Sequence, residues 1–137
     1  MAKYSGGCAC GAVRYEISAE PLMTGHCQCD KCRHLSGSGH SDLMFFAKDA
    51  VKIKGKMSKW SYITDSGKQS TRSFCATCGS HICGTGKGAP TMIGITAGSL
   101  DDPSVYKPQI VVFAKTDRAW DLIAADLPHF PGVPPMQ

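Results

Sequence analysis

Three cysteines within six residues, Cys27, Cys29 and Cys32, constrain this chain more than any other feature of its sequence. Residues two apart on an extended segment point to the same side, so Cys27 and Cys29 can face one point. The two residues between Cys29 and Cys32 allow a tight turn that brings those thiols together as well. Three converging thiolates suit a soft, tetrahedral metal ion, and zinc is the default. Because zinc takes four ligands, this three-cysteine group leaves one position for something else.

Four further cysteines stand in two pairs with metal-binding spacing. The N-terminal pair is Cys8 and Cys10, and the central pair is Cys75 and Cys78. A glycine follows each pair, and glycine lets the backbone turn tightly around an ion. Seven of the eight cysteines therefore belong to such groups, which indicates metal binding rather than scattered thiols.

The spacing leaves open which groups share an ion. In one arrangement, Cys29 and Cys32 join the central pair, although 42 residues separate them, well beyond the usual spacing of a zinc ribbon. In the other, the two pairs form a closed four-cysteine site and the three-cysteine group keeps an open position, which water or a substrate thiol could fill. A closed site is structural, whereas an open one can take part in chemistry. The protein residues that could fill the open position are Cys83, His26, His34 and His40.

Length and cysteine usage indicate one domain in a reducing setting. The 137 residues fit a single domain over residues 1–137. The polar, glycine-rich start lacks the pattern of a secretory signal, and the longest apolar run, Ile110–Ala114, is far too short to cross a bilayer. We therefore expect a cytoplasmic protein without a membrane partner, in which clustered cysteines bind metal more often than they form disulfides. The oligomeric state is not indicated.

The charge argues against a nucleic-acid partner. The formal net charge is +4 with the cysteines counted as neutral. Two metal ions held by seven thiolates would reduce it to about +1, because ligand cysteines are deprotonated. The only basic run, five lysines between residues 48 and 59, interleaves with Val51 and Ile53 and is interpreted as the solvated face of a strand.

Short alternating segments and glycine turns predict a mainly β, single-domain fold with little helix, held together by zinc. One helical turn is expected within residues 30–35, and a short helix around Trp120, within residues 117–126. The proline-rich tail, 127–137, is expected to be irregular. Strands are expected over residues 13–17, 41–47, 50–54, 81–84, 91–97 and 109–115, with a hairpin over 59–74 that turns at 65–67.

The segments around the three cysteine groups resemble the glutathione-dependent formaldehyde-activating enzyme family, also called the centromere protein V family, whose fold is described as Mss4-like. The matching segments are Gly7–Tyr15, His26–Arg33 with Ser36 and Gly37, and Phe74–Ser80, and the ending with Trp120, Leu127, Pro128 and Phe130 fits too. All seven cysteines of the family pattern are present in order. Cys83 and the short chain are departures from it.

The resemblance implies two zinc ions per chain. A structural zinc would be bound by Cys8, Cys10, Cys75 and Cys78, and a second, open zinc by Cys27, Cys29 and Cys32. The resemblance also implies a small-molecule thiol partner, glutathione. The implied activity is that of a carbon–sulfur lyase-type enzyme, which forms S-hydroxymethylglutathione from glutathione and formaldehyde.

Four residues are candidates for further roles in such a reaction. The oxyanion of the adduct needs a proton, which His34, His40 or water could donate. Arg33 or Arg72 could bind the carboxylates of glutathione in bidentate fashion. The alternative is a non-catalytic, zinc-stabilised module that binds or carries glutathione or another thiol, because one fold hosts many functions.

Overall fold

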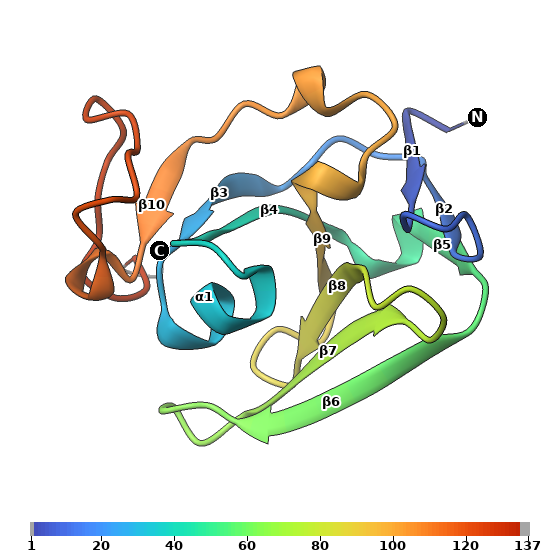
Figure 1. Ribbon diagram of the computed structural model, residues 1–137, viewed down its shortest axis with the longest axis horizontal. Coiled ribbons are helices and arrows are strands. Elements are labelled where there is room, and N and C mark those ends of the chain that lie inside the picture. Colours follow the sequence, from blue (N-terminus) through green and yellow to red (C-terminus); the bar gives the residue numbers. More distant parts are fainter. Residues whose placement is uncertain (1, 135–137) are drawn as a thin grey trace.

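Ten short strands in two sheets form the framework of the computed structural model, which describes residues 2–134 (Figure 1). The smaller sheet is antiparallel in the order β1-β2-β5, and the larger has the order β10-β3-β4-β9-β8-β7-β6. In the larger sheet β10 runs parallel to β3, and the other neighbours are antiparallel. The strands are β1 (Tyr4–Gly7), β2 (Arg14–Ile17), β3 (Met23–Cys27), β4 (Ser41–Ala47), β5 (Val51–Lys54), β6 (Met57–Ile63), β7 (Gln69–Cys75), β8 (His81–Gly86), β9 (Met92–Thr96) and β10 (Ile110–Val112).

Helix is scarce in the described part of the chain, so the mainly β prediction is confirmed. The one α-helix there, α1 (Asp30–Ser36), begins after Cys29 and ends at Gly37, whose φ of 69° is a left-handed conformation that glycine adopts without strain. None of the helices in residues 2–134 is long and apolar enough to cross a membrane. The short 3-10 helices are η1 (Lys48–Ala50), η2 (Ala97–Ser99), η3 (Pro103–Val105) and η4 (Ala114–Thr116).

The main core lies between the two sheets. Along β2, Tyr15 and Ile17 are buried and their neighbours are exposed, because successive strand residues face opposite sides. They pack against buried side chains of β4, β8 and β9, such as Phe46 and Ile95. The Tyr15 hydroxyl lies 2.7 Å from that of Ser99, which satisfies its polar end in the core.

Most predicted elements are confirmed within a few residues. The strand over 41–47 is β4, the hairpin is β6–β7, and the helical turn at 30–35 is α1. In β5 the lysines are exposed while Val51 and Ile53 are partly buried, which confirms a solvated lysine face. Two strands were not predicted, β1 and β3, because each contains glycine and lacks the alternation that marks a half-buried strand. In β3, a side chain at Gly25 would meet the Ile110 carbonyl of β10 at 2.5 Å, so glycine permits that close pairing.

The helix expected around Trp120 is wrong, because residues 117–126 form turns and bends. Trp120 is 65% exposed and Leu122 is 90% exposed, so the segment has no apolar face to bury as a helix. Between them, the side chain of Asp121 turns inward to His40. The tail is irregular through residue 134, as predicted, and residues 135–137 lie outside the described part.

Candidate metal centres

The N-terminal and central pairs come together at the edge of the main core. Their four Sγ atoms all lie within 4.8 Å of one another. The Sγ atoms of Cys8 and Cys10 are 3.6 Å apart, and those of Cys10 and Cys75 are 3.8 Å apart. Sulfurs bound to one tetrahedral zinc at about 2.3 Å would be about 3.8 Å apart. The four cysteines, Cys78 included, therefore fit a closed metal site.

Backbone N–H groups point at the sulfurs of this four-cysteine group. Val13 donates to Cys8 Sγ at 3.2 Å, and Thr77 and Cys78 donate to Cys75 Sγ at 3.3 and 3.4 Å. Such bonds favour the thiolate over the thiol. Because Cys8 follows β1 and Cys75 ends β7, an ion held here would tie the smaller sheet to the larger one.

The three-cysteine group lies where β3 passes into α1. Cys27 ends β3, Cys29 caps the helix, and Cys32 lies in its first turn. Their Sγ atoms lie within 4.8 Å of one another, and no fourth Cys, His, Asp or Glu of residues 2–134 joins them. Cys29 Sγ accepts a hydrogen bond from the Cys32 N–H at 3.3 Å. Cys27 is 8% and Cys32 0% exposed, and Cys29 is partly buried, so most of this group is shielded from water.

Arg72 of β7 places a positive charge beside these sulfurs. Its Nη2 lies 3.6 Å from Cys32 Sγ, and its Nε and Nη2 donate to the Tyr62 hydroxyl at 3.3 and 3.1 Å. The pKa of Cys32 is lowered, first by hydrogen bonds from Cys27 and Cys29 and also by the charge of Arg72. Burial opposes the charge on Arg72, but Cys32 and Tyr62 outweigh it, so the pKa of Arg72 is raised.

A mostly apolar pocket of about 180 Å³ adjoins the three-cysteine group. Cys27 and Cys32 lie in its wall, and Arg72 supplies its permanent charge. An apolar cavity of ~150 Å³ is large enough for benzene, so this pocket admits a small group and no more. The apolar wall comes from β3, β4, β10 and the C-terminal segment and includes Leu43, Phe45, Val112 and Phe113.

Three sequence-predicted candidates lie away from this pocket. Cys83 is 4% exposed within the main core, whereas Cys27 and Cys32 belong to a separate small cluster. His34 is exposed on α1. Arg33 pairs across 3.4 Å with Asp30 on its own helix. Of the two predicted arginines, the structure brings Arg72 to the cysteines.

The histidines next to the cysteine motif form a different cluster, with Asp42. His40 Nε2 lies 3.2 Å from Asp42 Oδ2, and His26 Nδ1 lies 2.6 Å from Asp42 Oδ1. On its other side, His40 Nδ1 lies 2.7 Å from Asp121. The pKa of His40 is raised to about 9, first by its bond to Asp42 and then by Asp121. The sequence did not indicate either aspartate as a site residue. Asp42 meets His26 only through strand pairing, and Asp121 reaches His40 only from a turn that is distant in the sequence.

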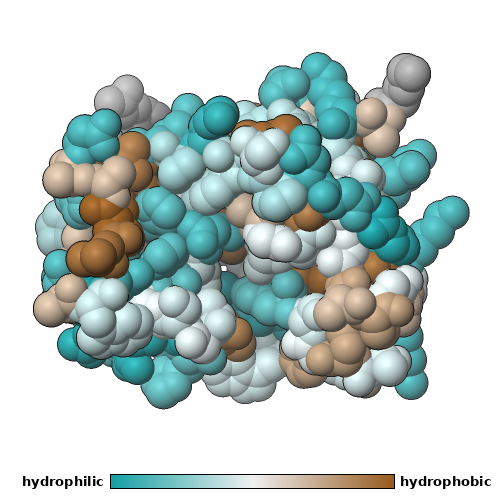
Figure 2. Space-filling model, turned by 45° about the horizontal axis from the view of Figure 1, so that its top comes forward, coloured by the Kyte–Doolittle hydropathy of each residue, from teal (hydrophilic) through white to brown (hydrophobic). Residues whose placement is uncertain are grey.

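A larger cleft of about 890 Å³ separates the end of α1 from the four-cysteine group. Its walls include Ser36 and Ser38 on one side, Ser80 on the other, and His40 and His81. Figure 2 shows a hollow near the middle of the face that it draws. None of the three-cysteine group lines this cleft, whereas Cys27 and Cys32 line the apolar pocket.

A mainly β framework with two separate thiol-rich groups defines a β-sheet protein whose cysteines could hold metal ions, with four potential ligands in one group and three in the other. Comparison with known proteins is more specific. The family model described as glutathione-dependent formaldehyde-activating enzyme matches residues 3–116, and the chain belongs to that family.

A solved structure supports the fold. The chain is similar to a Rhodobacter sphaeroides protein whose crystal structure was determined as a structural genomics target, with a TM-score of 0.58. The two share 22% sequence identity over 71% of this chain and 87% of that one. At this identity the likeness concerns the fold alone.

Proposed function

We propose that the three-cysteine group holds a zinc ion and that a thiol bound there reacts with formaldehyde. The observation that carries this proposal is an incomplete donor set of three thiols, two of them in the wall of a mostly apolar pocket, with Arg72 beside it. Membership of the glutathione-dependent formaldehyde-activating family supports glutathione as the thiol and S-hydroxymethylglutathione as the product. The four-cysteine group would hold a second, structural zinc.

The donor set suits this role. Three thiolates select a soft ion such as zinc and leave one of its four positions free. When bound, zinc would hold the substrate thiol as a thiolate at that position. Arg72 balances part of the negative charge that Cys32 and its two neighbours bring, and the apolar wall excludes water from the reacting sulfur.

The reaction needs little from the chain beyond binding and orientation. The substrate thiol loses its proton to solvent as it binds. Its sulfur then donates an electron pair to the carbonyl carbon of formaldehyde, so a C–S bond forms while the C=O π pair moves onto oxygen. That oxygen takes a proton from water, because His34 is exposed on α1 and His40 is held between two carboxylates.

The pocket limits how glutathione can bind. At about 180 Å³ and with an apolar wall, it fits the thiomethylene end and formaldehyde, but not two carboxylates. The ionised ends of the tripeptide would therefore remain at the surface. Arg72 is engaged with Cys32 and Tyr62, so we assign it to the sulfur end rather than to a glutathione carboxylate.

The test follows the exchange of formaldehyde between free and thiol-bound forms by NMR, with zinc-loaded protein and glutathione. We expect the wild-type protein to make this exchange faster than it is in buffer. With Cys29→Ser, the exchange should proceed at the rate measured in buffer. Cys83→Ala is the matched control, because it removes a buried cysteine outside both groups. Retained zinc in the four-cysteine group shows that each variant is folded.

The rival function is a thiol-binding or carrier module without catalysis, which the same open donor set and pocket would serve. Calorimetric binding of glutathione that is lost in Cys29→Ser, together with unchanged exchange in the wild-type protein, would establish this alternative. Acceleration that persists in folded Cys29→Ser would contradict both functions, because the catalysis would not need the three-cysteine group and a non-catalytic module would show none.

A further inference from the structure

Two histidines and an aspartate converge on the side of the larger sheet opposite to Cys27. His26 of β3 and Asp42 of β4 are directly paired across the two strands, as are Cys27 and Ser41. Since neighbouring strand residues face opposite sides, His26 points away from its neighbour Cys27 and shares a face with Asp42. His40 stands two residues before Asp42 and reaches the same point.

The spacing of the donor atoms fits one metal ion. One nitrogen from each histidine and a carboxylate oxygen of Asp42 all lie within 4.8 Å of one another. Ligands about 2.0–2.1 Å from a tetrahedral ion are about 3.3 Å apart, and His40 Nε2 lies 3.2 Å from Asp42 Oδ2. The 2.6 Å contact between His26 Nδ1 and Asp42 Oδ1 has to widen by several tenths of an ångström, which a turn of either side chain supplies.

The contact between His26 and Asp42 is close but does not meet the geometry of a hydrogen bond. His26 Nδ1 is buried and lies 2.6 Å from Asp42 Oδ1. A cation bound between the two atoms would take both of them as ligands.

A second carboxylate orients His40 in the manner typical of metal ligands. The ring contacts both oxygens of Asp121 through Nδ1, at 2.7 and 2.9 Å. The side chain of Asp121 is 6% exposed and also accepts a hydrogen bond from Gln28 Nε2 at 3.2 Å. With its proton on Nδ1, a metal-bound His40 would direct the lone pair of Nε2 to an ion beside Asp42. Histidines that bind metals commonly donate their other nitrogen to a carboxylate in this way.

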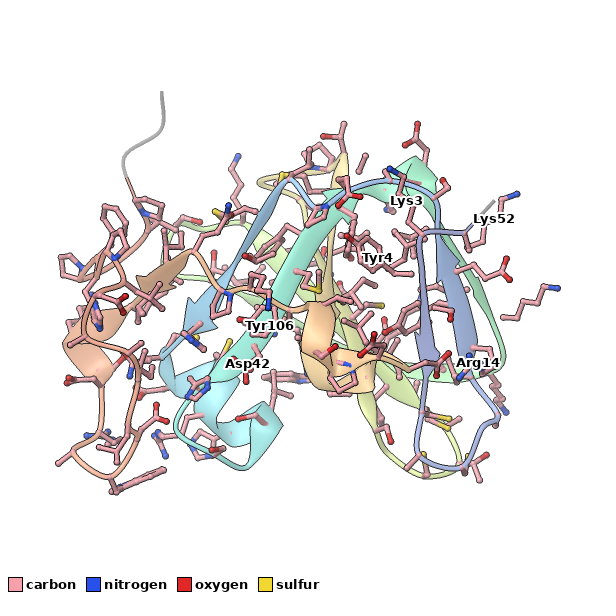
Figure 3. The ribbon with its side chains drawn as sticks, turned by 90° about the horizontal axis from the view of Figure 1, so that it is seen from above. Lys3, Tyr4, Arg14, Asp42, Lys52 and Tyr106 are labelled. Carbon is pink, nitrogen blue, oxygen red and sulfur yellow. The ribbon has the colours of Figure 1, made fainter. Side chains whose placement is uncertain are left out.

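The remaining side of the cluster is open. His26, His40 and Asp42 lie in the wall of a cavity of about 380 Å³, which Tyr106 and Leu122 also line. Figure 3 shows Asp42 on β4 and Tyr106 on the segment that leads to β10, close together near the centre of the view. Three protein ligands beside a cavity leave coordination positions for water or a small ligand.

We propose that His26, His40 and Asp42 form a third metal site, which binds a divalent first-row transition ion through two imidazoles and one carboxylate. This donor set favours Zn²⁺, Fe²⁺ or Co²⁺ over Ca²⁺ or Mg²⁺, which prefer oxygen ligands. The two carboxylates, Asp42 and Asp121, give the site the negative charge that balances a dication. It shares no ligand with either cysteine group and does not depend on the proposed reaction.

The test titrates Co²⁺ into protein whose cysteine groups are already filled with zinc and whose weaker sites have been cleared with a mild chelator. We expect one equivalent to bind with visible d–d absorption and without thiolate-to-cobalt charge transfer, because no sulfur is a ligand. Asp42→Asn and His40→Ala should each weaken this binding at least 100-fold. Asp121→Asn should weaken it 10- to 100-fold at unchanged stoichiometry, as expected for a residue that orients a ligand.

His129→Ala is the matched control, since it removes an exposed histidine whose ring contacts a backbone carbonyl, and binding should be unchanged. Proton NMR of the wild-type protein gives a readout that needs no variant: Co²⁺ should shift the ring signals of His26 and His40 and leave those of His34 in place. Three results would each overturn the site. They are the absence of an additional equivalent of bound Co²⁺, the appearance of thiolate-to-cobalt charge transfer, and binding that survives both Asp42→Asn and His40→Ala.

Discussion

Arg72 Nη2 lies 3.6 Å from Cys32 Sγ, across the gap between β7 and α1. The two residues are far apart in sequence. Their contact places the permanent positive charge of the Arg72 guanidinium beside a buried sulfur. Three thiolates around one Zn²⁺ carry a net charge of about −1. Arg72 therefore compensates charge that the apolar pocket does not solvate.

Replacing Arg72 should weaken metal binding by the three-cysteine group. In Arg72→Gln the sulfurs lose a charged hydrogen-bond donor, and we expect release of the ion to a chelator to be about 10- to 100-fold easier, as for other residues that support metal ligands. Arg118→Gln is the control, because Arg118 is exposed. Cobalt charge-transfer bands report on the sulfur-bound ion, and equal release from the two variants would remove any role of Arg72 in holding it.

Breaking the four-cysteine group should destabilise the whole fold. Cys75→Ser removes a buried thiol from the four-cysteine group, which brings the end of β7 to the loop after β1. Binding of structural zinc contributes about 10–16 kcal/mol in zinc-finger peptides, so we expect a loss of several kcal/mol here. Thermal unfolding and metal analysis should show a much lower Tm and one metal ion fewer than in the wild type. A variant that loses the ion but keeps its Tm would contradict a structural role.

Cys83 should behave as a small core residue. It is 4% exposed in the main core, and burial raises its pKa, so its thiol should not react with labelling reagents until the protein unfolds. Cys83→Ala should cost about 1 kcal/mol of stability and leave the metal content unchanged. Cys83→Ser should cost more, because it buries a hydroxyl. Rapid labelling of Cys83 in the folded, metal-loaded protein would refute this role.

Spacing rules explain how much of this architecture follows from the sequence. The cysteine motifs identify the seven candidate metal ligands, because ligand spacing within a motif is a local property, and alternation identifies most strands. Which cysteines share one site depends instead on the tertiary fold. Cys8 meets Cys75 only because the smaller sheet packs against the larger. The histidine cluster cannot be predicted from local sequence either. His26 meets Asp42 through the register of β3 and β4, and His40 meets Asp121, which lies 81 residues away in the sequence.

The ion pair between Arg14 and Asp101 gives a pH-dependent prediction at the edge of the 890 Å³ cleft. Arg14 donates from both Nη atoms to the two carboxylate oxygens of Asp101, with Nη1 at 2.9 Å. The hydrogen bonds from Arg14, then that from Ser5, lower the pKa of Asp101 to about 2. In Arg14→Gln this pKa should rise towards its ordinary value of 3.8.

A folded-state pKa below the unfolded value stabilises the protein above the unfolded pKa, and that contribution disappears as the pH falls through the folded one. Carbon NMR of the Asp101 carboxyl should therefore show it still mostly ionised at about pH 3 in the wild type and mostly protonated there in Arg14→Gln. Lys3→Gln, which removes a cation paired with Glu20, should leave the Asp101 titration unchanged. If Asp101 titrates alike in the wild type and Arg14→Gln, its low pKa comes from Ser5 and not from the ion pair.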